Sequence, residues 1–219
     1  MIIAVDGPAA SGKGTLARRL AEHFDYAYLE TGLLYRAVAL MVLEAKGDPS
    51  DPAAAERAAR AFDFARLQDP AWRQALAADR VSNAASEVAA VPGVRAALLE
   101  LQRDFVRRPP GDKAGVVLDG RDTGTVIAPE ADVKLYVTAS PEVRAGRRHK
   151  ELQDRGVDSI YARVLEDLKA RDTRDSARAA APLKPAADAI VLDTSALDAD
   201  RAFEAALAAI RLKTSGGAR

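Results

Sequence analysis

The sequence predicts an α/β fold with a five-stranded parallel sheet flanked by helices, and three observations support this prediction. Five short apolar runs have the character of β-strands, helical patterns lie between or after most of them, and the first run leads into a glycine-rich turn that opens a helix. Strands that alternate with helices form a parallel sheet covered on both faces. We therefore expect one α/β core with any other segment inserted into it.

The first half of the core is expected to repeat a strand–loop–helix unit. Residues 2–5 form an apolar run that ends at Asp6-Gly7, and a glycine-rich turn and an amphipathic stretch from residue 13 to about 23 follow it. Residues 26–29 form the next strand, and a helical stretch continues from Thr31-Gly32 to residue 41. The repeat is typical of a parallel sheet.

The second half supplies the remaining strands. They are short, β-rich runs at residues 115–118, 133–137 and 190–192. Helical patterns follow them at residues 141 to about 154, about 159–169 and 200–211.

The β signal nearly vanishes between about residues 47 and 111, where the chain is rich in Ala and charged residues and is punctuated by proline. We interpret this segment as a mostly helical insertion. A shorter segment, at the end of the helix predicted from residue 141 to about 154, is rich in Arg, Lys, His and Asp. The expected organisation is a core of residues 1–46, 111–146 and 157–219, an insert of residues 47–110, and an excursion of residues 147–156.

Composition excludes several classes of protein. The chain has 219 residues with 32 basic and 32 acidic side chains, so its zero net charge provides no whole-chain field for a polyanion such as nucleic acid. There is no cysteine for a thiolate nucleophile or zinc site, and the two histidines lie far apart. We find no signal peptide or long apolar run, and so expect a cytoplasmic protein without membrane contact.

The strongest functional motif is a phosphate-binding loop, the P-loop. The letters GPAASGKGT follow the first strand directly and open a helix. Glycines let backbone N–H groups surround phosphate oxygens, the helix N-terminus adds partial positive charge, and Lys13 reaches the β- and γ-phosphates. The alternative is a purely structural turn before a helix. We expect ATP or GTP to bind at Gly7, Pro8, Ala9, Ala10, Ser11, Gly12, Lys13, Gly14 and Thr15.

Two oxygen-bearing residues are candidates for holding the Mg²⁺ that accompanies the nucleotide. The hydroxyl of the loop comes at Thr15, one position later than in the general motif, so it would contact Mg²⁺ directly or through water. Asp119 either ends a strand as a turn residue or anchors the water shell of the metal. The GKGT form of the loop resembles nucleoside monophosphate kinases.

Arginines gather in the second half of the chain. An acceptor that is already a phosphate monoester supplies an anionic nucleophile, so its kinase needs cations rather than a general base. Two sets have helical spacing: Arg144, Arg147 and Arg148, and, if that stretch is helical, Arg171, Arg174 and Arg178. The alternative is a solvated basic face with acidic partners. Asp172 and Asp175 interleave with the second set, where they would either pair with its arginines or position a ribose.

Further segments resemble, in order along the chain, the signatures of the bacterial cytidylate kinase family. They read LETGLLYR at residues 29–36, VSNAAS at 81–86, VR at 94–95, DGRDTGT at 119–125, RD at 171–172 and 174–175, and APL at 181–183. The resemblance implies a P-loop NTPase core, a monophosphate-binding insert at residues 47–110 and a short mobile lid at residues 147–156.

The same resemblance implies the roles of individual positions. CMP would be held by Thr31, Tyr35, Arg36, Ser86, Arg95, Arg121, Asp122, Arg171, Asp175 and Arg178. Within that set Ser86, Arg95 and Asp122 would line the cytosine, and Asp175 and Arg178 would hold the sugar. Charge during transfer would be compensated by Lys13, Arg144, Arg147, Arg148, Arg171 and Arg174. The plainer readings are a core tyrosine at Tyr35 and a surface or capping serine at Ser86.

The expected reaction transfers the γ-phosphoryl group of Mg·ATP to CMP or dCMP in pyrimidine nucleotide metabolism, by a monomer that binds neither nucleic acid nor membrane. The rivals are a P-loop kinase of AMP, UMP or a sugar acid, and a non-catalytic nucleotide-dependent module or RNA-binding ATPase. Two positions depart from the family pattern. Glu30 stands where Asp is common, and residues 62–80 are polar and Ala-rich where β-hairpins are usual, so this stretch is helical or abbreviated.

Overall fold

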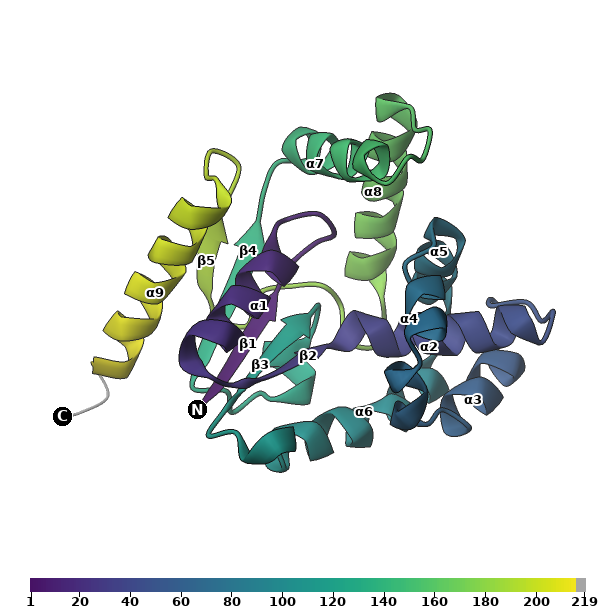
Figure 1. Cartoon of the computed structure of the whole chain (residues 1–219), viewed down its shortest axis with the longest axis horizontal. Helices are drawn as coiled ribbons and strands as arrows, with labels where there is room; N and C mark the ends of the chain where they lie inside the picture. The colour runs from purple at the N-terminus through teal and green to yellow at the C-terminus, as the bar shows by residue number, and fades with distance from the viewer. Residues whose placement is uncertain (216–219) are drawn as a thin grey trace. The chain divides into compact units, whose positions relative to one another are not determined.

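A computed structural model describes residues 1–215 (Figure 1). The chain forms two compact units, each with its own hydrophobic core. Unit 1 comprises Met1–Leu29 and the chain from Val106 onward, and unit 2 comprises Glu30–Phe105. Among residues 1–215, none of the helices is both long and apolar enough to span a bilayer.

The sheet of unit 1 has five strands in the order β2-β3-β1-β4-β5. Their bounds are β1 Ile2–Asp6, β2 Ala27–Glu30, β3 Val116–Gly120, β4 Val133–Thr138 and β5 Ile190–Asp193. β1 pairs in parallel with both β3 and β4, and β4 pairs in parallel with β5. The prediction of a five-stranded parallel core is confirmed, and every predicted strand lies within two residues of an observed one.

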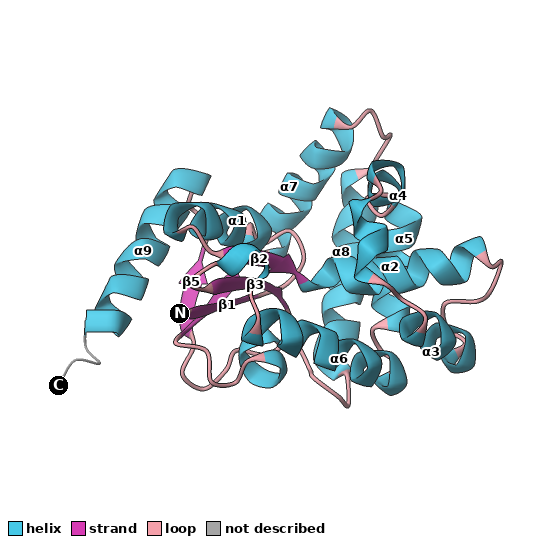
Figure 2. Ribbon diagram, turned by 60° about the horizontal axis from the view of Figure 1, so that its bottom comes forward, coloured by secondary structure: helices cyan, strands magenta, loops and turns pink. Residues whose placement is uncertain are grey.

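Two helices cover one face of this sheet, as Figures 1 and 2 show. They are α1, Lys13–Phe24, and α9, Ala199–Ser215, whose side chains Leu20 and Ile210 pack in one core with Ile3 and Val5 of β1. Alternate residues of a strand point to opposite faces, so Ala4 faces away from these helices. The π-helical turn η3, Thr123–Ile127, lies on that second face, where an added Cβ at Gly124 would be 3.5 Å from Ala4 Cβ.

The two helices after β4 form a pair (Figure 1). α7, Pro141–Asp154, begins where the Ser140 hydroxyl accepts a hydrogen bond from Val143 N at 3.3 Å. α8, Tyr161–Ala177, packs against it through a small apolar cluster that includes Leu152 and Leu168. The second arginine set is therefore helical at Arg171 and Arg174, and Arg178 is the first residue after the helix.

Unit 2 consists of helices and the turns that connect them. Its elements are α2 Thr31–Glu44, α3 Pro52–Arg60, η1 Phe64–Gln68, α4 Pro70–Ala75, α5 Asp79–Val88 and most of α6 Pro92–Arg107, which the turn η2 Pro110–Asp112 follows. Residues 47–110 hold no strand, so the predicted helical character of this segment is confirmed, and residues 62–80 form helical turns and no β-hairpin. Unit 2 begins earlier than the predicted insert because α2 packs on α5. The division into insert and lid stays a prediction.

A three-residue contact organises the polar stretch of unit 2. The indole N–H of Trp72 donates to Glu44 Oε1 at 3.1 Å, and the guanidinium of Arg66 lies 4.4 Å from the Trp72 ring centroid and 3.5 Å from Glu44 Oε2. Trp72 is buried, so its N–H needs a partner. The residues come from α4, α2 and η1, which links these three elements.

Trp72→Phe should therefore lower the free energy of unfolding by about 1–2 kcal/mol, because it leaves Glu44 without its indole donor while keeping most of the ring. Chemical denaturation followed by circular dichroism checks this, since the chain has only one tryptophan. Arg73→Ala, at the exposed neighbouring position, is the control. Equal stability of the Phe variant and the wild type would contradict the role of the indole bond.

Candidate active site

The P-loop wraps tightly between β1 and α1. Gly7 has a φ of +154°, and a Cβ there would lie 2.0 Å from the carbonyl oxygen of Val137, so only glycine fits. A Cβ at Gly14 would meet Asp119 Oδ2 at 3.0 Å, which shows how closely the end of β3 approaches the loop. The predicted strand–loop–helix context is confirmed.

Lys13 and Asp119 meet beside this loop. Lys13 Nζ lies 3.6 Å from Asp119 Oδ1, and the Tyr28 hydroxyl donates to Asp119 Oδ2 at 3.2 Å. Asp119 is buried at the carboxyl end of β3, whereas Thr15 is exposed in the first turn of α1. Carboxylate and hydroxyl oxygens are the donors that Mg²⁺ prefers, so the residues present fit the predicted metal.

Arg144 and Arg147 of α7 both bind the backbone of the P-loop. Arg144 is buried and donates to Ala9 O at 3.2 Å, while its other N–H groups bind Ala139 O and the Asp172 carboxylate, the latter at 2.6 Å. Arg147 donates to Ser11 O at 3.3 Å. Both side chains brace the loop, and their predicted part in charge compensation stays a prediction.

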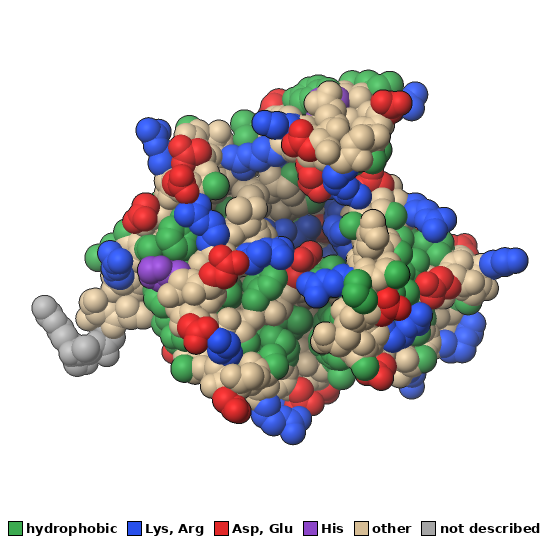
Figure 3. Space-filling model, viewed as in Figure 1, with side chains coloured by type: hydrophobic (Ala, Val, Ile, Leu, Met, Phe, Trp, Pro, Cys, Tyr) green, Lys and Arg blue, Asp and Glu red, His purple; other side chains and the backbone are tan. Residues whose placement is uncertain are grey.

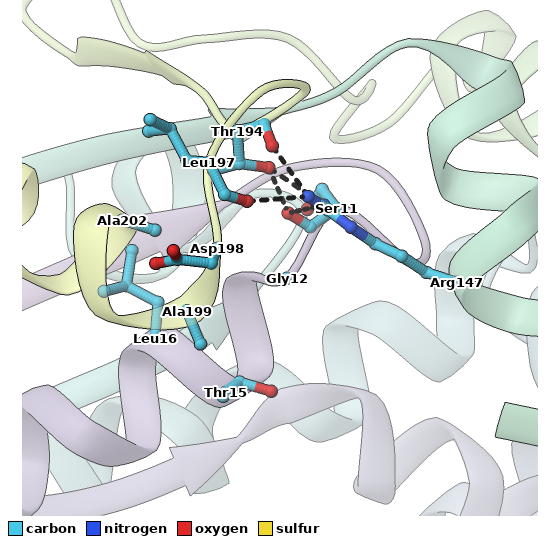
Figure 4. A pocket seen from close by; sticks show the side chains of 10 residues that line it. All are labelled: Ser11, Gly12, Thr15, Leu16, Arg147, Thr194, Leu197, Asp198, Ala199 and Ala202. Carbon is cyan, nitrogen blue, oxygen red and sulfur yellow. Dashed lines mark hydrogen bonds between the residues drawn. The ribbon is translucent and has the colours of Figure 1, made fainter. Parts of the chain in front are cut away.

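Thr194, directly after β5, completes the bracing of the P-loop. Its hydroxyl lies 2.9 Å from Ser11 O and accepts from Arg147 Nη1 at 3.0 Å, and its carbonyl accepts from Arg147 Nη2 at 2.6 Å. Figure 4 shows these bonds converging on Ser11 and Arg147. Thr194 is not among the residues predicted from the sequence, because its only local signal is that it is a polar residue one position after a strand.

A pocket of about 220 Å³ lies next to these contacts in unit 1. One side is formed by the P-loop and the start of α1, with Gly12 and Thr15, and the other by the chain between β5 and α9 (Figure 4). Its apolar lining comes from Leu16, Leu197, Ala199 and Ala202. An apolar cavity beside a phosphate loop suits a flat aromatic base.

One buried carboxylate gathers three arginines at the end of α8. Asp175 Oδ2 lies 3.2 Å from Arg121 Nε and 3.9 Å from Arg171 Nε, and its other oxygen accepts from Arg178 Nη2. Burial raises the pKa of the Asp175 carboxyl, but the charges of the three arginines outweigh it and hold that pKa below its ordinary value. Three cations around one anion leave net positive charge, which suits a phosphate.

The aspartates of α8 thus have different partners. Asp172 pairs with Arg144 of α7, whereas Asp175 pairs with Arg171 and Arg178 of the second set and with Arg121. Arg148 forms an ion pair with Glu151 at 2.6 Å, one turn further along α7, and Arg174 is exposed. Helical spacing alone did not distinguish these surroundings.

The predicted CMP-binding residues of unit 2 come from helices α2, α5 and α6. Arg95 places its guanidinium 5.4 Å from the centre of the Tyr35 ring, and Arg36 donates to Leu76 O at 3.3 Å. Thr31 is buried at the start of α2. The Ser86 hydroxyl is buried on α5, and within the described part of the chain it has no hydrogen-bond partner. A buried hydroxyl without a partner suits a ligand group.

Residues 3–212 match the cytidylate kinase family. The cytidylate kinase of Paramagnetospirillum magneticum is 59% identical over 97% of this chain and 98% of its own length, and that of Xanthobacter autotrophicus is 59% identical over 99% and 100%. The chain belongs to the cytidylate kinase family. A solved structure of an uncharacterized protein from Eubacterium ventriosum shares the fold at 17% identity, with a TM-score of 0.54 and coverage of 97% and 98%.

The surface of this member of the cytidylate kinase family fits its balanced composition. On the face in Figure 3, Lys and Arg side chains are interspersed with Asp and Glu. The equal numbers of basic and acidic residues in the sequence agree with this picture.

Asp6 is a buried carboxylate that the sequence analysis did not assign to the cytidylate kinase site. Its Oδ1 accepts from Thr123 N at 2.8 Å and from Thr123 Oγ1 at 2.9 Å, and its Oδ2 accepts from Gly124 N at 2.8 Å. Burial raises the pKa of the Asp6 carboxyl to about 6, because lost hydration outweighs these hydrogen bonds.

This pKa predicts a pH dependence of stability. The folded-state pKa of about 6 lies above the ordinary value of 3.8, so the contribution of Asp6 to stability is fully present below about pH 4 and is lost as pH rises through about 6. Between these limits the free energy of unfolding of the wild type should fall by about 3 kcal/mol relative to Asp6→Asn. Urea titrations of both proteins at a series of pH values check this. A constant difference across the range would contradict it.

Proposed function

We propose that this chain transfers the γ-phosphoryl group of ATP to CMP or dCMP, giving ADP and CDP or dCDP. The observation that carries the proposal is a P-loop with Lys13 held beside Asp119, in a chain that belongs to the cytidylate kinase family over residues 3–212. The acceptor of such a reaction is a phosphate monoester and brings its own nucleophilic oxygen. The protein therefore has to bind, orient and neutralise two phosphate groups.

On the donor side, residues 7–15 would hold the ATP phosphates, and the pocket beside Gly12 would take the base. Lys13 lies beside Asp119 in the structure. When ATP binds, the Lys13 side chain would move toward the β- and γ-phosphates. Mg²⁺ would be held by Thr15 and Asp119, directly or through water, and supplies charge neutralisation on the donor phosphates when bound. Arg144, Arg147 and Thr194 keep the loop in shape for this ligand.

On the acceptor side, Arg121 and Arg171 would bind the CMP phosphate, and Asp175 and Arg178 would bind the sugar. Asp175 holds these guanidiniums together before any ligand arrives, which lowers the ordering cost of binding. We assign Thr31, Tyr35 and Arg36 to the acceptor phosphate as well. Ser86, Arg95 and Asp122 are assigned to the cytosine, and the buried hydroxyl of Ser86 supports this assignment.

Charge that develops during transfer would be compensated by Lys13 and by arginines of α7 and α8. We propose this role for Arg144, Arg147, Arg148, Arg171 and Arg174. Arg148 forms an ion pair with Glu151, which is half exposed, and Arg144 forms one with Asp172. Residues 147–156 are proposed as the lid that excludes water from the reaction. The cytoplasmic location and the monomeric state stay predictions of the sequence.

An acceptor screen tests the proposed reaction against its rivals. ADP release from ATP should be fastest with CMP or dCMP and much slower with UMP and AMP, in a coupled assay on the purified chain. Lys13→Ala should lower turnover by roughly a hundredfold or more while the chain stays folded, because a cation at the transferring group is lost. Lys113→Ala, which removes a surface lysine paired with Asp25, should leave turnover unchanged. A preference for AMP, or wild-type turnover in Lys13→Ala, would refute the proposal.

Asp122 is expected to distinguish cytosine from uracil. Cytosine offers an amino donor where uracil offers a carbonyl, and a buried carboxylate accepts from the first and repels the second. A mispaired buried acceptor costs about 1–3 kcal/mol, so Asp122→Ala should narrow the ratio of kcat/KM for CMP over UMP by roughly ten- to a hundredfold. Glu130→Ala, an exposed carboxylate of the same loop, is the control. An unchanged ratio in Asp122→Ala would remove the base-reading role.

A further inference from the structure

We propose that Asp6 is a positioning residue for the acceptor site, which fixes the turn that follows Arg121 and Asp122. The inference rests on the proposed function, because Arg121 and Asp122 are the residues assigned to the CMP phosphate and to the cytosine. Asp6 itself touches neither substrate in this proposal. It acts through the backbone of the turn.

The contacts of Asp6 all lead to that turn. Within residues 1–215, every hydrogen bond of its carboxylate comes from Thr123 and Gly124, the two residues directly after Asp122. The bonds span more than a hundred residues of sequence and are buried. A carboxylate with several short donors is a strong anchor, since charge-assisted bonds are about twice as strong as neutral ones.

The turn needs such an anchor because its own backbone pattern is irregular. η3 is a single π-helical turn in which the carbonyl of Asp122 accepts from Thr125 N, Val126 N and Ile127 N. π-turns are rare and occur mostly at functional sites. The first N–H groups of a helical turn have no partner inside it, and Asp6 accepts those of Thr123 and Gly124. Without Asp6 the N-terminal end of η3, next to Asp122, loses these bonds.

A second side chain holds the other end of the same turn. Lys134 of β4 donates from Nζ to Pro129 O at 2.6 Å and to Asp188 Oδ1 at 3.0 Å, and its stem would lie 3.2 Å from a Cβ at Gly124. The turn is therefore fixed between β1 and β4. Asp6 binds the N–H groups directly after Asp122, whereas the ammonium of Lys134 binds the carbonyl of Pro129, two residues past the end of η3.

The P-loop is supported by different residues, although Asp6 directly precedes it. Arg144, Arg147 and Thr194 bind the carbonyls of Ala9 and Ser11. Donor-side and acceptor-side loops thus have separate braces that start from the same edge of the sheet. This separation predicts that loss of the Asp6 bonds affects the acceptor more than ATP.

Kinetics of Asp6→Asn test the proposal. An asparagine keeps the size of Asp6 but turns one acceptor oxygen into an N–H donor that faces a backbone N–H. KM for CMP should rise by roughly ten- to a hundredfold, the loss expected for charge-assisted bonds, while KM for ATP changes by less than about threefold. The ratio of kcat/KM for CMP over UMP should fall as well. Asp25→Asn, the same substitution at an exposed carboxylate paired with Lys113, should leave both KM values unchanged.

A second variant keeps the test independent of the P-loop and of any folding defect in Asp6→Asn. Thr123→Val removes only the hydroxyl bond to Asp6 and keeps the shape of the side chain, so it should raise KM for CMP in the same direction by roughly three- to tenfold. Thr123→Ser keeps the hydroxyl and should behave as the wild type. Circular dichroism verifies that each variant is folded.

Two outcomes would overturn the inference. If Asp6→Asn changes KM for ATP and for CMP equally, Asp6 supports both the P-loop and the turn η3 and does not act on the acceptor site in particular. If both Asp6→Asn and Thr123→Val keep the wild-type KM values, Asp6 has no role in positioning. Failure of the proposed function looks different, because the wild type itself would then show no preference for CMP over UMP or AMP in the acceptor screen.

Discussion

Parallel pairing of β1 with β3 and β4 is the constraint on which the rest of unit 1 depends. In this register Val5 lies opposite Asp119 and Leu135, and Asp6 lies opposite Gly120 and Tyr136, so these strands end together at one edge of the sheet. The P-loop, the DGRDTGT segment and the chain leading to α7 all leave the sheet there. Carboxyl ends of parallel strands are where ligands bind in open α/β sheets. The sheet thus brings the P-loop and the DGRDTGT segment of unit 1 together without any long loop.

Aspartates then arrange what the sheet brings together. Asp119 holds Lys13, Asp172 holds Arg144, Asp175 gathers three arginines, and Asp6 holds backbone N–H groups. The carboxylates of Asp6, Asp119 and Asp175 are buried, which is unfavourable unless charged or N–H partners replace part of the lost hydration. The partners are therefore ordered before substrate arrives. An enzyme that works by positioning and electrostatics benefits from this, because little reorganisation is left for the reaction itself.

The three arginines of α7 that share one helical spacing have different partners in the structure. Arg144, Arg147 and Arg148 follow one helical stripe, yet Arg144 is buried against Asp172, Arg147 binds backbone carbonyls of two segments, and Arg148 forms an ion pair with Glu151 one turn along its own helix. A guanidinium that donates to backbone carbonyls braces a loop, whereas a surface ion pair contributes little to stability. The partner, rather than the spacing, decides the role.

Local patterns in the sequence were sufficient for the strands, the main helices, the P-loop and the helical character of residues 47–110, because each depends on periodicity, turn chemistry or neighbours within a few residues. The family signatures added the candidate CMP residues in order along the chain. Only the tertiary structure decided that Asp6 reaches Thr123, that Thr194 reaches Ser11, and that Asp175 rather than Asp172 joins Arg121. These contacts join residues 54 to 183 positions apart. Strand pairing and helix packing set such distances, and no local pattern records them.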